Sequence, residues 1–303
     1  MSGGGDSTRA ILFALGANLA IAVAKGVAAF VTGSGAMLAE TVHSFADCGN
    51  QLLLLLGLRQ ARRPPTPDHP LGYGRAIYFW SFLVALMLFS VGGVYSLYEG
   101  VHKLQHPEPL QQWWWALGVL AFAIVAESVS MRACLQEVAK VRGGRGIWQW
   151  FRQSREAELV VIFGEDLAAL VGLVLAFFAV VLSVVTGNPL WDALGTIAIG
   201  ALLIVVAVLV AIEVKSMLIG QSVEPELEKK LVAWLLARRE IDHLIRVIPM
   251  QHGNEVVLSV QAVMCEKADA GALLADIERV EDELKAAFPA VRWTFFEPDT
   301  PRG

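Results

Sequence analysis

Six long apolar segments constrain the fold of this chain more than any other feature of its sequence. They cover residues 10–31, 36–58, 73–97, 113–133, 159–185 and 190–212, and Gly, Pro or charged residues separate them. A helix needs about 20 mostly apolar residues to cross a hydrocarbon core of about 30 Å. The sequence therefore predicts an α-helical membrane protein with six transmembrane helices.

The composition excludes several other classes of protein. Of the 303 residues, 55% are hydrophobic and only 17% are charged, which argues against a wholly soluble chain. The net charge is −5 and its acidic excess lies in the C-terminal tail, so a nucleic-acid partner is not expected. Cys48, Cys134 and Cys265 lie far apart, which argues against a disulfide framework or a zinc knuckle.

The basic residues near the segment ends predict the orientation in the membrane. They gather between the second and third segments and between the fourth and fifth: Arg59, Arg62, Arg63, Arg75, Arg132, Lys140, Arg142, Arg145, Arg152 and Arg155. We therefore expect both loops, and both chain termini, on the cytoplasmic side. The short polar start predicts no cleavable signal peptide. Because no organellar targeting segment is evident either, the bacterial inner membrane is the simplest expectation.

Residues 220–303 are expected to form a second domain after a membrane domain of residues 1–219. Helical periodicity covers residues 225–239 and 268–288, and alternating apolar residues predict strands over 244–250, 255–264 and 291–296. A three-stranded sheet with both helices on one face would bury the apolar residues of this tail. Modules of this kind often dimerise, so we expect a homodimer.

Ionisable residues inside the apolar segments point to function, because each costs at least about 2.5 kcal/mol at the centre of a bilayer. Segment two carries Glu40, His43 and Asp47. Segment four carries Glu127, segment five carries Glu165 and Asp166, and segment one carries Asn18 and Lys25. Such residues normally mark an ion or substrate pathway.

His43 and Asp47 are four residues apart, so both project from one face of a helix. An imidazole next to a carboxylate suits a borderline divalent cation such as Zn²⁺. The alternative is a His–Asp hydrogen bond that only ties spans together. At 1.5 Å per residue, Asn18, Asp47, Glu127 and Asp166 all fall near one depth. An alternating-access carrier places its substrate site at such a depth.

Other charged residues are interpreted as structural. Lys25 and Glu40 are expected to form an ion pair that holds the first two spans together, in preference to a direct role in ion handling. Glu99, Asp192 and Glu213 lie at span ends, where we expect them to meet water. A second hypothesis is a regulatory metal site in the tail, but the candidate ligands there do not have the spacing of a metal-binding motif. We therefore interpret these residues as solvated loop residues: His243, His252, Cys265, Glu266 and Asp269.

Residues 33–51, GSGAMLAETVHSFADCGNQ, resemble the second-span signature of the cation diffusion facilitators. The similarity extends to the six spans, the motif Gly72-Tyr73-Gly74-Arg75, the Glu165-Asp166 pair and the tail, and it is strongest for the branch of zinc transporter nine. The resemblance implies a ferredoxin-like dimerising tail. It also implies a dimeric secondary transporter that exports Zn²⁺, or a similar divalent ion, from the cytoplasm in exchange for protons.

The same resemblance implies a four-ligand transport site made by His43, Asp47 and a His-x-x-x-Asp pair in the fifth span. Asp166 matches that Asp, but Ile162 stands where the family has its His. The fourth ligand could be Glu165, Glu127 or water, in that order of preference. If further carboxylates bind, the site has more oxygen than is usual for zinc, which leaves Mn²⁺, Fe²⁺ and Co²⁺ open.

The expected mechanism needs no prosthetic group and no covalent chemistry, so we predict that the chain is not an enzyme. Metal ligands must be deprotonated, so an entering cation would expel protons and returning protons would displace the cation. The alternative is an intramembrane zinc metalloenzyme that uses His43, Asp47 and Asp166. The sequence has no H-E-x-x-H motif and no separate general base, so the metalloenzyme is the weaker hypothesis.

Overall fold

The computed structural model describes residues 4–107, 110 and 112–300, with the side chains of 4–14 and 17 excepted. It separates into two compact units. The first contains residues 1–57, 80–145 and 158–214, and the second contains 58–79, 146–157 and 215–303. The second unit therefore combines the tail with two loops that the sequence places between spans.

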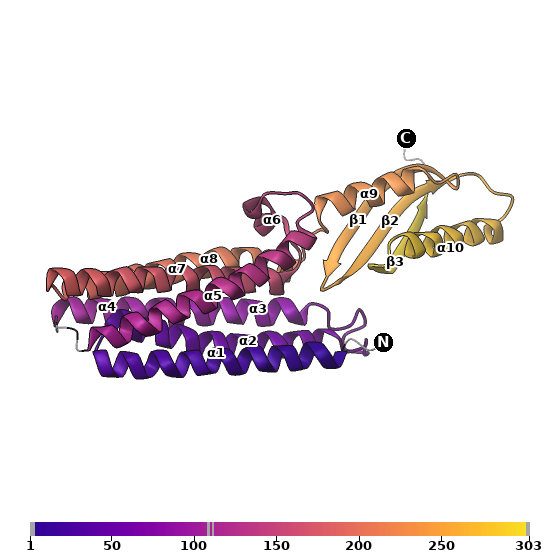
Figure 1. Ribbon diagram of the computed structural model, residues 1–303. Coiled ribbons are helices and arrows are strands. Elements are labelled where there is room, and N and C mark those ends of the chain that lie inside the picture. Colours follow the sequence, from indigo (N-terminus) through magenta and orange to yellow (C-terminus); the bar gives the residue numbers. More distant parts are fainter. Residues whose placement is uncertain (1–3, 108–109, 111, 301–303) are drawn as a thin grey trace. The chain divides into compact units, whose positions relative to one another are not determined.

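The first unit is a bundle made by most of the length of the following helices (Figure 1). They are α1 (Gly4–Thr32), α2 (Gly35–Ala61), α3 (Ala76–Met87), η1 (Leu88–Val94), α4 (Tyr95–Gln105), α5 (Trp113–Val141), α7 (Ala157–Thr186) and α8 (Leu190–Ile219). The last few residues of α2 and α8 and the first few of α3 belong to the second unit. Among the described residues, four helices are long and apolar enough to cross a membrane: 76–105, 113–141, 157–186 and 190–219. The prediction of an α-helical membrane protein is confirmed at this level.

The third span contains a π-helical segment, η1, which the sequence analysis did not predict. Gly93 of η1 faces α8 so closely that an added Cβ would lie 2.5 Å from Ile204 Cγ1. On α8, a Cβ at Gly200 would lie 2.7 Å from the backbone nitrogen of Leu97. Small residues allow helix backbones to approach closely in this way, and the contact fixes how α8 packs on the third span.

The first turn of α2 is held by a residue of α8. Ser34 Oγ donates to Asp192 Oδ1 at 2.6 Å, and the Gly35 amide donates to Asp192 Oδ2 at 2.7 Å. Asp192 is 3% exposed and Glu213 is 5% exposed, so the expectation that these two meet water is wrong. The carboxylate of Asp192 instead caps the amide groups at the start of α2, which compensates for the loss of water.

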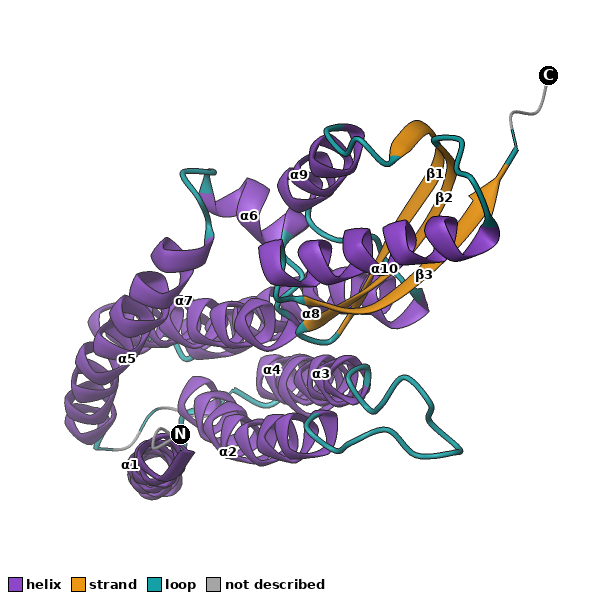
Figure 2. Ribbon diagram, turned by 90° about the vertical axis from the view of Figure 1, so that its right-hand side faces the viewer, coloured by secondary structure: helices purple, strands orange, loops and turns teal. Residues whose placement is uncertain are grey.

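The second unit contains the predicted order of helix, strand, strand, helix and strand (Figure 2). The elements are α9 (Pro225–Leu236), β1 (Ile241–His252), β2 (Glu255–Met264), α10 (Ala270–Ala287) and β3 (Val291–Asp299). The sheet order is β1-β2-β3, with β1 antiparallel and β3 parallel to the central strand. Both helices cover one face, because residues of α9 and α10 share a core with alternate residues of β2: Leu231, Leu235, Val280, Leu284, Val256, Leu258, Val260 and Ala262.

The loop before α3, together with Tyr78 in the first turn of α3, lies against the turn between β1 and β2 within the second unit. The Gly253 amide donates to Tyr78 Oη at 2.9 Å. A Cβ at Gly74 would lie 2.6 Å from the carbonyl oxygen of His252, so only glycine fits there. His252 itself is 6% exposed, and neither ring nitrogen has a hydrogen-bond partner among the described residues. The Gly72-Tyr73-Gly74-Arg75 motif therefore docks on the hairpin turn.

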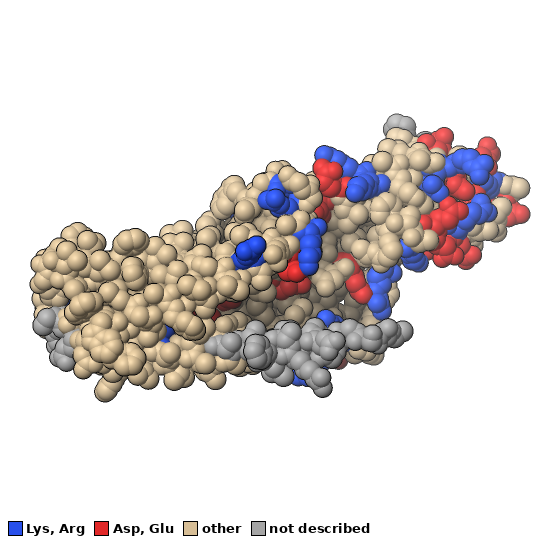
Figure 3. Space-filling model, viewed as in Figure 1, with Lys and Arg blue, Asp and Glu red and all other residues tan. Residues whose placement is uncertain are grey.

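The two units also differ in surface chemistry. Figure 3 shows Lys, Arg, Asp and Glu side chains crowded on the tail, whereas the visible surface of the helices is almost free of them. Large apolar side chains are instead exposed on the helices; Phe30 is 91% exposed and Phe122 is 64% exposed. A surface of this kind suits contact with lipid.

Candidate metal site

The helix α2 presents His43 and Asp47 from the same face, as their spacing predicts. His43 Nδ1 lies 3.5 Å from Asp47 Oδ1. The side chain of His43 is 1% exposed and that of Asp47 is 17% exposed. The pair is therefore enclosed by the bundle, with the histidine deeper than the carboxylate.

Several polar atoms on this face lack a hydrogen-bond partner among the described residues. Both nitrogens of His43, Oδ1 of Asp47 and Oδ1 of Asn50 are buried without a hydrogen-bond partner in the described part of the chain. A buried polar atom without a partner is costly, and in most proteins a partner is found. A cation bound between His43 and Asp47 would supply a partner for one ring nitrogen and for the carboxylate oxygen.

Polar groups from three helices meet beside this pair. A cavity of about 10 Å³ is lined by Asn18 of α1, Ser44 and Asp47 of α2, and Glu127 of α5, with Ile21 on its apolar side. This volume is at the lower limit for one water-sized occupant. The structure thus brings together three of the residues that the sequence analysis placed at one depth.

The two adjacent carboxylates of α7 contact different helices. Glu165 is 7% exposed, and its Oε1 accepts a hydrogen bond from Asn50 Nδ2 at 2.6 Å. Asp166 Oδ2 instead accepts from Ser130 Oγ of α5 at 3.2 Å. Adjacent helix positions point about 100° apart, so one residue can face α2 while the next faces α5. Ile162 is 37% exposed and offers no ligand atom.

The family resemblance assigns Asp166 to the ion, whereas in this structure Glu165 is the α7 carboxylate that contacts α2. Glu127 lines the same small cavity as Asp47. Within the described residues, no three His, Cys, Asp or Glu side chains are close enough to hold one ion. The structure therefore contains a two-residue pair with further carboxylates nearby.

Lys25 and Glu40 lie on neighbouring helices and are fully buried. Lys25 Nζ lies 3.4 Å from Glu40 Oε2 and donates to Ser44 Oγ at 2.7 Å. Oε1 of Glu40 has no partner among the described residues. It lies close to Gly172 of α7, where an added Cβ would be 2.6 Å from this oxygen. This arrangement joins α1 to α2 and leaves room for Glu40 against α7.

Three residues near the site, Asn50, Ser44 and Ser130, were not singled out from the sequence. Asn50 follows Asp47 by three positions and His43 by seven, so helical periodicity alone places it on their face. Helical periodicity could therefore have identified Asn50 from the sequence. Ser44 and Ser130 carry no comparable signal, because a serine in a membrane helix commonly bonds to its own backbone.

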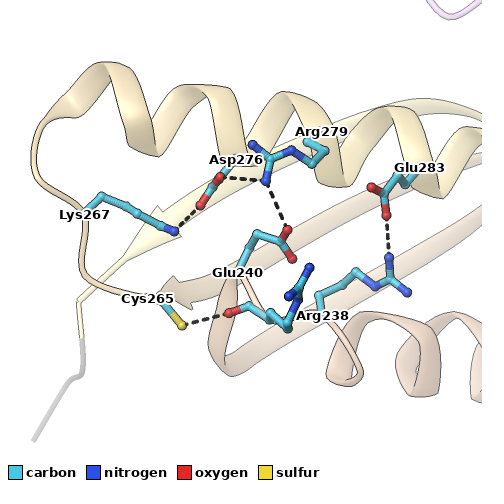
Figure 4. Close-up of polar contacts among 8 residues, drawn as sticks. Arg238, Glu240, Cys265, Lys267, Asp276, Arg279 and Glu283 are labelled. Carbon is cyan, nitrogen blue, oxygen red and sulfur yellow. Dashed lines mark hydrogen bonds and ion pairs between the residues drawn. The ribbon is translucent and has the colours of Figure 1, made fainter.

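Two of the five tail residues that were considered for a regulatory metal form other contacts, and Figure 4 shows that of Cys265. Cys265 Sγ donates to the carbonyl oxygen of Arg239 at 3.1 Å, and Asp269 accepts from the Ala272 amide as the cap of α10. His252 is buried, so its interpretation as a solvated loop residue is wrong. The described tail residues give no support for a metal site there.

Comparison with known proteins identifies relatives over most of the chain. The proton-coupled zinc antiporter SLC30A9, mitochondrial, of Xenopus laevis is 36% identical over 219 residues, covering 72% of this chain and 38% of that protein. The human protein of the same name is 33% identical over 226 residues, covering 74% and 39%. The chain thus spans about two fifths of the length of these relatives.

A bacterial relative matches over a longer range at lower identity. The manganese efflux system protein MneP of Bacillus subtilis is 24% identical over 261 residues, which cover 84% of this chain and 83% of that protein. Residues 11–219 match the family model described as the cation efflux transmembrane domain. The chain therefore belongs to the cation efflux family, the cation diffusion facilitators whose second-span signature its residues 33–51 resemble.

Proposed function

We propose that this chain is a secondary transporter that exports a divalent cation, with Zn²⁺ as its principal substrate, in exchange for protons. The observation that carries the proposal is the buried His43–Asp47 pair inside a helical bundle, in which both ring nitrogens and Asp47 Oδ1 have no hydrogen-bond partner in the described part of the chain. A purely structural His–Asp contact would be expected to form a hydrogen bond, whereas His43 Nδ1 and Asp47 Oδ1 lie 3.5 Å apart without one. The names of the SLC30A9 relatives agree with this substrate and with proton coupling.

Exchange follows from one set of groups that can take either a cation or protons. Asp47, Glu127 and Glu165 are acidic groups from three helices in a poorly solvated region. Either a divalent cation or protons can neutralise them, and ligation requires that the groups be deprotonated. Cation entry from one side would therefore release protons, and protons arriving from the other side would release the cation.

The proposed ligands are His43, Asp47 and Glu165, with Glu127 as the next candidate and Asp166 and Asn18 in supporting positions. The contact between Glu165 and α2 is the reason for ranking it above Asp166. Imidazole with two carboxylates suits Zn²⁺. A fourth ligand from Glu127 would make the site richer in oxygen and extend its substrates to Mn²⁺, Fe²⁺ or Co²⁺.

The architecture that we propose has six membrane-crossing helices, in which α1 and α2 join the four apolar ones. Residues 1–219 would form the transport domain, and residues 220–303 a ferredoxin-like domain that pairs two copies. The sheet face opposite the helices supports such pairing, because Ile248 and Phe295 lie beside Ser259 on it and are 51% and 54% exposed. Both termini would face the cytoplasm, and the bacterial inner membrane stays a prediction.

The test is metal-driven proton flux in proteoliposomes that contain the purified chain. We expect His43→Ala and Asp47→Ala to abolish flux with Zn²⁺ while leaving the oligomer intact. Thr41→Val on the same helix is the matched control, since Thr41 Oγ1 donates only to the Met37 carbonyl of its own helix in the described contacts. Normal flux in either site variant would refute the assignment.

A further inference from the structure

Asn50 forms the direct polar contact between the ligand-bearing face of α2 and the acidic pair of α7. It is fully buried, and its Nδ2 donates to Glu165 Oε1 at 2.6 Å. Amide-to-carboxylate hydrogen bonds are stronger than neutral ones because the acceptor is charged. The bond therefore favours the rotamer in which Glu165 faces α2.

The other half of the Asn50 amide has no such partner. Its Oδ1 is buried without a hydrogen-bond partner among the described residues, as is Oδ1 of Asp47 on the same helix. A residue that served only to tie α2 to α7 would leave an orphaned carbonyl at a cost of roughly 1 to 3 kcal/mol. A cation beside this face would remove that cost, since carbonyl oxygens are good ligands for hard divalent ions.

We propose that Asn50 is a positioning and specificity-determining residue of this site, holding Glu165 against the His43–Asp47 face and offering its own Oδ1 to the cation. The inference rests on the proposed transport function and adds to it a determinant of ion choice. Zn²⁺ is satisfied by four ligands including nitrogen, whereas Mn²⁺ favours more oxygen ligands. The amide oxygen should therefore matter more for Mn²⁺ than for Zn²⁺.

The test compares Zn²⁺ and Mn²⁺ transport by Asn50→Ala in proteoliposomes. Loss of one net hydrogen bond or ligand contact corresponds to roughly a two- to tenfold change in affinity. We expect the half-saturating concentration to rise about tenfold for Mn²⁺ and no more than about threefold for Zn²⁺. Asn50→Gln, which keeps the amide, should recover part of the Mn²⁺ affinity.

A double-mutant cycle separates positioning from general damage. If Asn50 acts through Glu165, Asn50→Ala should change Mn²⁺ affinity less in a Glu165→Gln background than in the wild type. Thr41→Val again serves as the control, because it also removes a buried polar group from the same helix. Alanine is small and a good helix former, so the variant is expected to insert and fold, which melting in detergent checks.

Three outcomes overturn the inference: unchanged affinities in Asn50→Ala, equal losses for both ions, or additive effects of the Asn50 and Glu165 variants. Failure of the underlying function is distinguishable from these results. In that case the wild type would show no metal-driven proton flux, or Asp47→Ala would transport normally. If the wild type were active, Asp47→Ala inactive and Asn50→Ala unaltered, only the role of Asn50 would be rejected. The proposed transport function would stand.

Discussion

Removal of the Asp192 carboxylate is expected to destabilise the bundle, because this group holds the first turn of the helix that bears His43 and Asp47. Its oxygens accept hydrogen bonds from Ser34 Oγ at 2.6 Å and from the Gly35 amide at 2.7 Å. A weaker contact comes from the Ala36 amide at 3.4 Å. Asp192→Ala would leave these donors without an acceptor in a region that excludes water.

The size of this destabilisation follows from the two short hydrogen bonds. A hydrogen bond to a charged group contributes about 1.5 to 3 kcal/mol, and a helix N-cap is worth about 1 kcal/mol. These terms overlap, so we expect Asp192→Ala to cost about 3 to 5 kcal/mol in the free energy of unfolding. At about 2 to 4 °C per kcal/mol for a unit of this size, the melting temperature should fall by roughly 6 to 20 °C. Asp192→Asn keeps one acceptor and should lose about half as much.

The assay is thermal unfolding of the purified full chain in detergent, followed by tryptophan fluorescence at neutral pH. Glu137→Ala is the control, because Glu137 is 59% exposed and pairs only on the surface with Lys140. It should alter stability by no more than about 1 kcal/mol. If Asp192→Ala melted within about 2 °C of the wild type, the reasoning about this cap would be wrong.

Two further predictions concern the packing of α8 and the loop that docks on the tail. Gly200→Ala should destabilise the bundle by about 1 to 3 kcal/mol, because the new methyl would meet the backbone of Leu97, whereas Gly118→Ala, with open space around it, should be neutral or slightly stabilising in the same melting assay. Burial and the nearby Arg75 guanidinium lower the pKa of His252 below its usual 6.5, so the neutral ring is the folded form. The stability that it contributes is complete above about pH 6.5 and is lost as the pH falls, since the unfolded chain then binds more protons. Hydrogen exchange of residues 71–75 and 251–254, corrected for intrinsic rates, should therefore increase between pH 7.5 and 5.5 in the wild type but not in His252→Gln.

The tail could be predicted closely because its elements are encoded by local periodicity. The second strand was predicted over 255–264, and the structure has β2 at Glu255–Met264. The first strand is longer than predicted, Ile241–His252 in place of 244–250, because pairing with β2 continues to both ends of the hairpin. Pairing with a neighbouring strand is a tertiary effect that alternation within one segment does not report.

The apolar segments and their rare ionisable residues were equally evident, because hydrocarbon imposes a length and a polarity that are visible residue by residue. The spacing of His43 and Asp47 likewise determined that they share a helical face. These features depend on one helix at a time, so the sequence was sufficient to determine them.

The rotation of each helix about its own axis was decided only by tertiary packing. It turns Glu165 toward Asn50 and Asp166 toward Ser130. It also buries Asp192 against the start of α2. Periodicity defines the faces of a helix but not which neighbouring helix each face contacts. That depends on how helices pack, for example on the close approach of the third span and α8 at Gly93 and Gly200. The sequence by itself therefore determined which residues are available to hold a cation, and the packed bundle decided which of them meet.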